Sequence, residues 1–319
     1  MGQMYNGIIN IYKEAGYTSH DVVAKLRGIL KQKKIGHTGT LDPEAVGVLP
    51  VCLGKGTKVC DLLTDKDKVY ETVMRLGVVT DTQDMTGKIL HESPVQVTRE
   101  ELETVLEQFR GAYDQIPPMY SALKVNGKKL YELAREGQVI ERRARRVQIL
   151  NLDLLEIEAD GVHVHMRVHC SKGTYIRTLC HDIGERLGCG AAMEKLTRTQ
   201  VGIFKIEDAL TLAQVENFVQ NDQIDSVIRS IDSLFTMWPA GQTLALADRL
   251  LYNGNMLSQK DLTLEDSEGT GAEKEKTAGD RKESESGEKF RVYDSQGQFC
   301  AVYVYDKRRR MFKNEKMFV

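Results

Sequence analysis

Residues 36–54 read GHTGTLDPEAVGVLPVCLG. The first eight of these contain a histidine, two threonines and an aspartate, together with two glycines. Five glycines over residues 35–56 disfavour a long regular helix. We therefore expect a tightly folded loop, the kind of segment that often carries catalytic side chains. An Asp-Pro pair is also typical of a turn in which Asp42 caps local amides, so this stretch alone leaves the role of Asp42 open.

The sequence on either side of this stretch predicts both helices and strands. Apolar residues at helical spacing predict helices over residues 19–31, 98–110, 175–187, 211–220 and 222–235. Ser19 is the expected N-cap of the first helix, and Thr98 with Glu101 forms a capping box at the second. Alternating β-rich residues predict strands over residues 68–79, 146–158, 162–170, 289–293 and 299–305. Because Asp160-Gly161 favours a tight hairpin, we expect an antiparallel sheet.

Chain length and one break in the pattern indicate two domains. A chain of 319 residues exceeds one small module, and Trp238-Pro239 interrupts the helical periodicity. We predict a first domain over residues 1–238 and a smaller, β-rich one over residues 239–319. Within the second, residues 265–288 contain no large apolar side chain, so we expect this acidic insert to stay unpacked.

The charge is distributed unevenly along the chain. The insert carries nine acidic and four basic side chains, and since the whole chain has a formal net charge of −2, the remainder carries +3. Basic residues cluster at residues 31–34, 128–129, 142–146 and 307–310. A charge run is usually a solvated face, but four separate clusters suit a polyanion that touches the protein at several places.

The sequence also disfavours several classes of protein. The apolar runs fall far short of the roughly 20 residues that cross a bilayer, and the N-terminus lacks secretory features, so we expect a cytoplasmic protein. The six cysteines lack the short paired spacings of a zinc ribbon. His163 and His165 share one face of a strand and could hold a metal, but an exposed sheet surface accounts for them as well, and we expect no metal.

Five further segments join the opening stretch in a family resemblance. They read YKEAGYTSHDVVAKLRG at 12–28, KVYETVMRLGVVTDTQDMTG at 68–87, QIPPMYSALKVNGKKLYELAREG at 115–137, CSKGTYIRTLCHDIGERLGCGA at 170–191 and LTRTQVG at 196–202. With residues 36–54, they resemble the bacterial tRNA pseudouridine synthase B (TruB) family over most of residues 8–235. The chain departs from the family pattern at Lys13-Glu14, where Lys-Pro is usual, and in its acidic insert.

The resemblance implies a fold and a reaction. The expected fold is α+β, with a mixed, largely antiparallel central sheet of the pseudouridine synthase type and a small PUA-like β-rich domain at the C-terminus. The expected reaction isomerises uridine 55 in the T-loop of tRNA to pseudouridine. It gains and loses no electrons overall, so no cofactor is expected, in line with a sequence that has neither a Rossmann nor a Walker A motif.

By the same resemblance, six residues form the site. Asp42 is the catalytic carboxylate, either as nucleophile or as the base that deprotonates C2′, and the sequence does not choose between the two routes. Arg177 keeps that carboxylate ionised, and Tyr70 lies against the target ring and assists removal of the C5 proton. Three further residues are expected to bind the substrate, with His37 inserted into the T-loop where a base has been flipped out: His37, Tyr175 and Leu196.

Two other functions remain as alternatives. A non-catalytic tRNA-folding protein could use the same loop insertion without chemistry. A metal-dependent phosphoesterase could use His37, Asp42 and the pair His163/His165. For the main hypothesis, the expected partner is tRNA, bound through its T-loop and T-arm. We expect no membrane association, no required protein partner and a monomeric chain.

Overall fold

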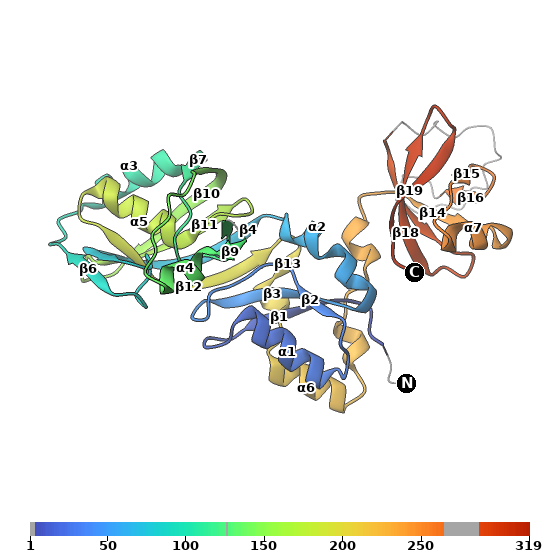
Figure 1. Ribbon diagram of the computed structural model, residues 1–319, viewed down its shortest axis with the longest axis horizontal. Helices are drawn as coiled ribbons and strands as arrows, with labels where there is room; N and C mark the ends of the chain where they lie inside the picture. The colour runs from blue at the N-terminus through green and yellow to red at the C-terminus, as the bar shows by residue number, and fades with distance from the viewer. Residues whose placement is uncertain (1–3, 126, 265–286) are drawn as a thin grey trace. The chain divides into compact units, whose positions relative to one another are not determined.

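The computed structural model of the chain describes residues 4–125, 127–264 and 287–319 (Figure 1). Its contacts define two compact units. The larger comprises residues 10–51 and 60–224, and the smaller comprises residues 1–9, 52–59 and 225–319 as far as they are described. Residues 225–238, which the sequence analysis assigns to the first domain, group by contacts with the smaller unit. The boundary at residue 238 stays a prediction.

A mixed nine-stranded sheet organises the larger unit. Its main path runs β1-β3-β12-β4-β11-β10-β7, with β2 paired to β3 and β13 paired to β12. Its strands are β1 (Gly7–Lys13), β2 (Ile35–His37), β3 (Val46–Leu53), β4 (Lys68–Leu76), β7 (Gly111–Gln115), β10 (Arg145–Ile157), β11 (His163–Cys170), β12 (Ala191–Val201) and β13 (Phe204–Lys205). β3 and β12 are parallel, whereas β12, β4, β11, β10 and β7 are successively antiparallel. The predicted hairpin between β10 and β11 is confirmed.

Helices and small hairpins complete the larger unit. They are α1 (Ser19–Ile29), α2 (Cys60–Thr64), α3 (Arg99–Phe109), α4 (Leu130–Arg135), α5 (Ile176–Leu187), α6 (Leu212–Gln220), and the hairpins β5 (Val78–Thr80) with β6 (Ile89–Glu92) and β8 (Lys124–Val125) with β9 (Lys128–Lys129). α3 starts at the predicted Thr98–Glu101 capping box. Together α3 and α5 bury Phe109, Leu179 and Ile183 against the sheet, each such side chain contributing about 1.5–3 kcal/mol.

Four local expectations differ from the structure. Thr18, not Ser19, caps α1, because the Thr18 hydroxyl accepts from the Asp21 N–H while the Asp21 carboxylate accepts from the Thr18 N–H. The expected loop over residues 35–56 contains β2 and β3. The strand expected over residues 68–79 divides at Gly77, which has a positive φ of 78°.

The helix expected over residues 222–235 is also wrong. The chain instead forms two short 3-10 turns, η3 (Ile224–Val227) and η4 (Asp232–Phe235). Asp222 follows α6 with a φ of 53°, a left-handed conformation that a continuing helix cannot contain.

The smaller unit contains a mixed six-stranded sheet in the order β15-β19-β18-β17-β14-β16. Its elements are η1 (Gly54–Val59), β14 (Ala240–Thr243), η5 (Ala245–Ala247), α7 (Asp248–Tyr252), β15 (Leu257–Ser258), β16 (Leu262–Leu264), β17 (Lys289–Tyr293), β18 (Phe299–Asp306) and β19 (Met311–Met317). The predicted β17–β18 hairpin is confirmed. The acidic insert lies outside the described residues, apart from Gly287 and Glu288. No helix among the described residues is long and apolar enough to span a membrane.

Candidate active site

The turn between β2 and β3 carries Asp42 and is fixed by residues of β1 and α1. The hydroxyl of Ser19, at the start of α1, accepts a hydrogen bond from the Leu41 N–H at 2.9 Å, and Leu41 is buried. On the other side, Lys13 at the end of β1 donates from Nζ to the Pro43 carbonyl at 2.8 Å. These two anchors hold the backbone on both sides of Asp42, while 43% of the Asp42 side chain stays exposed.

Arg177 lies directly beside this carboxylate. Its Nε is 3.0 Å from Asp42 Oδ2, and its side chain is only 6% exposed. The rest of the guanidinium is held by backbone: Nη1 donates to the Thr82 carbonyl at 3.1 Å and Nη2 to the Tyr120 carbonyl at 2.8 Å. Because Arg177 stands in the first turn of α5 behind the buried Ile176, the helix fixes its direction. The pair that the sequence resemblance implies is therefore formed.

A second carboxylate, Asp84, contacts the same arginine and is absent from our sequence predictions. Its Oδ2 lies 3.6 Å from Arg177 Nη1. Its other oxygen, Oδ1, accepts from the hydroxyls of Thr82 and Thr86 and from the Thr86 N–H. The sequence signal that points to Asp84 is the run DTQDMTG at 81–87, whose carboxylate and hydroxyl residues are typical of a polar turn. Arg177 thus bridges two carboxylates, one well hydrogen-bonded and buried and the other open.

These charges act on Asp42 in opposite directions. Removal of water by the surrounding protein raises its pKa most strongly, Arg177 lowers it, Asp84 raises it again and Lys13 lowers it. The net effect is a pKa above the ordinary value for aspartate. Asp42 is therefore a partly desolvated carboxylate whose ionisation depends on Arg177, a combination typical of reactive carboxylates.

Tyr70 and Tyr175 lie close enough to this carboxylate for its charge to act on them, and Leu196 packs against the apolar cluster that contains Tyr70. Tyr70 is buried on β4 in the same apolar cluster as Leu41, and the half-buried Leu196 packs against that cluster from β12. Tyr175 is half-buried immediately before α5; burial raises its pKa, the charge of Arg177 lowers it and the charge of Asp42 raises it. Buried Gln115 fixes the Tyr175 backbone by accepting from its N–H at 2.8 Å and donating to its carbonyl at 3.0 Å. Sequence reasoning had not singled out Gln115.

His37 occupies a separate position at the end of β2. Its ring meets the ring of His20 edge-on, with 6.0 Å between centroids. Its Nδ1 accepts from the Gly39 N–H at 3.4 Å, and burial lowers the pKa of His37. A neutral, half-buried imidazole suits stacking better than proton transfer. Within the described part of the chain, its hydrogen bond and ring contact involve Gly39 and His20 rather than Asp42, Arg177 or Tyr70.

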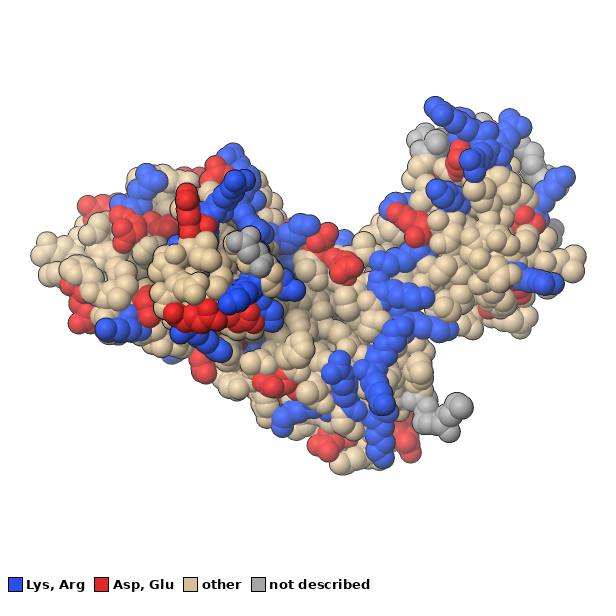
Figure 2. Space-filling view, viewed as in Figure 1, with Lys and Arg blue, Asp and Glu red and all other residues tan. Residues whose placement is uncertain are grey.

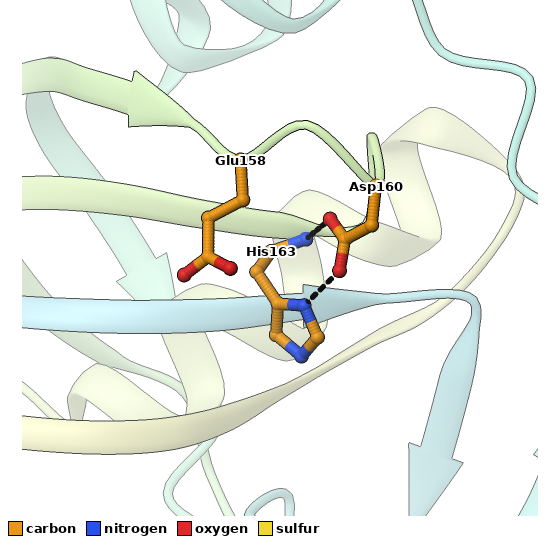
Figure 3. Close-up of side chains that lie close together, drawn as sticks. All are labelled: Glu158, Asp160 and His163. Atoms are coloured by element: carbon orange, nitrogen blue, oxygen red, sulfur yellow. Dashed lines mark hydrogen bonds and ion pairs between the residues drawn. The ribbon is translucent and has the colours of Figure 1, made fainter.

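The histidines considered as metal ligands, His163 and His165, lie on β11, and Figure 3 shows His163 with Glu158 and Asp160. Glu158, Asp160 and His163 place potential ligand atoms within 4.8 Å of one another, and among the described residues neither His37 nor Asp42 belongs to such a group. The His163 ring nitrogens face Asp160 at 2.5 Å and Glu194 at 2.9 Å, which fits a protonated imidazole, and the hydrogen bond to Asp160 raises the pKa of His163. His165 pairs with Glu158. This arrangement does not support the phosphoesterase hypothesis.

Profiles of known families match the chain in two adjacent regions. The profile described as TruB family pseudouridylate synthase (N terminal domain) matches residues 27–176, and the tRNA pseudouridylate synthase B C-terminal domain matches residues 177–236. A protein of Lachnoclostridium phytofermentans named tRNA pseudouridine synthase B is 52% identical over 98% of this chain and 100% of its own length. One of Staphylococcus aureus with the same name is 50% identical over 70% of this chain and 75% of its own.

Solved structures resemble the chain over nearly its whole length. A Cbf5-Nop10-Gar1 complex contains a chain that is 28% identical with a TM-score of 0.69, covering 98% of this chain and 85% of that one. An H/ACA RNP bound to a substrate RNA containing 2′-deoxyuridine contains one that is 26% identical with a TM-score of 0.68, at the same coverage. The α+β class, the mixed sheet and the β-rich C-terminal part are confirmed.

Proposed function

The chain belongs to the TruB family of tRNA pseudouridine synthases, and on this premise we propose that it isomerises uridine 55 in the T-loop of tRNA to pseudouridine. The family makes it an isomerase that acts on tRNA. The position of the uridine, the flipping of its base and the role of Asp42 are the parts that we propose. The observation that carries them is the open Asp42 carboxylate held at 3.0 Å by buried Arg177.

The chemistry needs one ionised carboxylate. The C1′–N1 bond of the uridine breaks, the uracil turns, a C1′–C5 bond forms, and the proton on C5 leaves while N1 gains one. Asp42 acts as the nucleophile or as the base at C2′, and in both routes it must be deprotonated when the substrate binds. Arg177 supports that state because its positive charge opposes the rise in pKa that desolvation causes.

The target base must leave the RNA stack to reach Asp42. The half-buried Leu196, which packs against the apolar cluster that contains Tyr70, offers apolar surface to a flipped uracil. His37, whose ring is half-buried and not engaged with the catalytic pair, suits the space that the base leaves in the T-loop. We assign it to substrate binding.

Basic side chains on the smaller unit support binding to tRNA. Figure 2 shows Lys and Arg side chains gathered at the end of the smaller unit where β18 turns into β19, and residues 307–310 of that turn read KRRR. This turn would contact RNA phosphates in the manner expected for the PUA-like domain. We propose a monomer in the cytoplasm that needs tRNA alone, without a protein partner.

The test is a positional assay on a tRNA transcript. After incubation with the purified chain, mass mapping should find pseudouridine at position 55 and at no other uridine. A transcript with cytidine at position 55 is the matched substrate control and should gain none. Pseudouridine at another position, or none in a correctly folded transcript, would refute the proposal. The non-catalytic alternative predicts tight binding of the same transcript without product.

A further inference from the structure

The strand β12, which our sequence predictions use only for Leu196, also carries a buried arginine between two parts of the site. Arg198 is the register partner of Tyr70 on the antiparallel strand β4 and of Gly47 on the parallel strand β3. Gly47 has a φ of 104°, and a Cβ there would lie 2.3 Å from the Arg198 carbonyl oxygen. Only glycine permits this approach. Arg198 is thus locked between the strand that follows the Asp42 turn and the strand of Tyr70.

Two backbone carbonyls anchor the guanidinium of Arg198. Its Nε donates to the Val48 carbonyl at 2.7 Å, and its Nη1 lies 3.5 Å from the Thr40 carbonyl. Thr40 is two residues before Asp42, and Val48 lies within β3. The side chain therefore spans the turn that carries the catalytic carboxylate, and it is 2% exposed.

This buried charge has no carboxylate partner among the residues that the structure describes. It lies near two buried lysines, since its charge contributes to lowering the pKa of Lys13 and that of Lys68, each to about 8, with burial as the larger cause. Its Nη2 is buried and has no hydrogen-bond partner within the described ranges. An unpaired buried cation is costly, so stability alone does not account for this arginine.

Arg198 and Tyr70 are direct cross-strand partners of β12 and β4, so their side chains leave the sheet on the same face, and both are buried. Burial raises the pKa of the Tyr70 hydroxyl, and the charge of Arg198 opposes that rise. We propose that Arg198 is a positioning residue for the isomerisation: its guanidinium, fixed by the Val48 and Thr40 carbonyls, holds the Tyr70 hydroxyl in place for the target uracil. The proposal rests on the proposed function and adds to it a residue that acts through Tyr70.

The experiment is a double-mutant cycle on the full-length chain, read out as single-turnover pseudouridine formation at position 55. Arg198→Met should lower the rate about 100-fold, and Arg198→Lys, which keeps the charge but not the fork of donors, about 10-fold. Dissociation constants for the tRNA should stay within about 2-fold of wild type. Arg167→Lys is the matched control, because Arg167 is exposed on β11 and pairs with Glu71. It should leave the rate unchanged.

The decisive comparison uses Tyr70→Phe. If Arg198 acts through the Tyr70 hydroxyl, Arg198→Lys should cost less than about 2-fold in a Tyr70→Phe background. A full 10-fold loss in that background, or a wild-type rate for Arg198→Lys alone, would overturn the proposal. If Arg198→Met does not fold, the comparison relies on Arg198→Lys alone. The thermal midpoint of Arg198→Lys is measured together with its rate. Failure of the proposed function is distinguishable, because the wild-type chain would then make no pseudouridine at position 55.

Discussion

Arg177 and His163 each lie between two carboxylates, and their side chains differ in burial. Arg177 bridges Asp42 and Asp84 with a side chain that is 6% exposed. His163 bridges Asp160 and Glu194 on the sheet surface with a side chain that is 25% exposed. Arginine stays charged throughout the accessible pH range, whereas histidine does not. A similar pattern of charges therefore has two different consequences: the buried Arg177 lowers the pKa of the carboxylate that we propose to be catalytic, and the exposed His163 bridge is expected to contribute modestly to stability.

Among the substitutions at these two bridges, replacement of Arg177 should have the largest effect on the reaction rate. Arg177→Met removes the charge that opposes desolvation, so the rate should fall about 1000-fold. It should also raise the pKa of Asp42 further, because the lowering contribution of Arg177 is lost. The acid limb of the single-turnover pH profile should then move to higher pH. An acid limb at the wild-type position would show that Arg177 does not govern this carboxylate.

Tyr70→Phe should have the next largest effect. The ring keeps its place in the apolar cluster, so binding should persist, while loss of the hydroxyl should slow turnover about 100-fold if it assists removal of the C5 proton. Single-turnover rates and tRNA affinity, measured side by side, separate the two contributions. A normal rate would argue against proton transfer by Tyr70.

Asp84→Asn should slow the reaction about 10-fold, because it loosens Arg177 without removing it. The sign of its effect on pH dependence is opposite to that of Arg177→Met. Asp84 raises the pKa of Asp42, so the variant should lower it and move the acid limb to lower pH. Acid limbs that move in the same direction in Asp84→Asn and Arg177→Met would contradict the proposed arrangement.

Loss of the exposed bridge at His163 should have the smallest effect on the protein. His163→Gln should leave turnover unchanged and reduce stability by no more than about 1 kcal/mol. The raised pKa of His163 means that its contribution is fully present below the unfolded value of about 6.5 and is lost as pH rises through the folded value. The difference in thermal midpoint between wild type and variant should therefore be larger at pH 6 than at pH 9. A difference that grows with pH would contradict the protonated bridge.

The parts of the fold that the sequence predicted are those specified by local patterns. The capping box at Thr98 and the Asp160-Gly161 turn each define an element boundary through neighbouring residues, and both were predicted correctly. β3 was missed because its glycines indicated a loop, whereas Gly47 is required by the close approach of β12. Because that contact joins residues 47 and 198, which are far apart in the chain, no local sequence pattern indicates it.

The residues of the candidate site also fall into two groups: those that sequence motifs identify and those that only the structure reveals. Motif resemblance identified Asp42 and Arg177, and the structure brings them together. It did not identify Asp84 or Gln115, because each acts through a partner about 60 or more residues away in the chain. A carboxylate in a polar turn and a glutamine at a strand end are ordinary in sequence. Only the tertiary contact reveals their part in holding the site.

The most direct test of the central claim is the Asp42→Asn variant, assayed for tRNA affinity and for pseudouridine formation in a single turnover. The replacement keeps the shape of the side chain and removes its charge. Asp65→Asn, which removes an exposed carboxylate paired with Lys172, is the matched control. The account predicts no detectable product from Asp42→Asn, with tRNA affinity close to wild type and full activity in the control. Product formed by Asp42→Asn at the wild-type rate would contradict it.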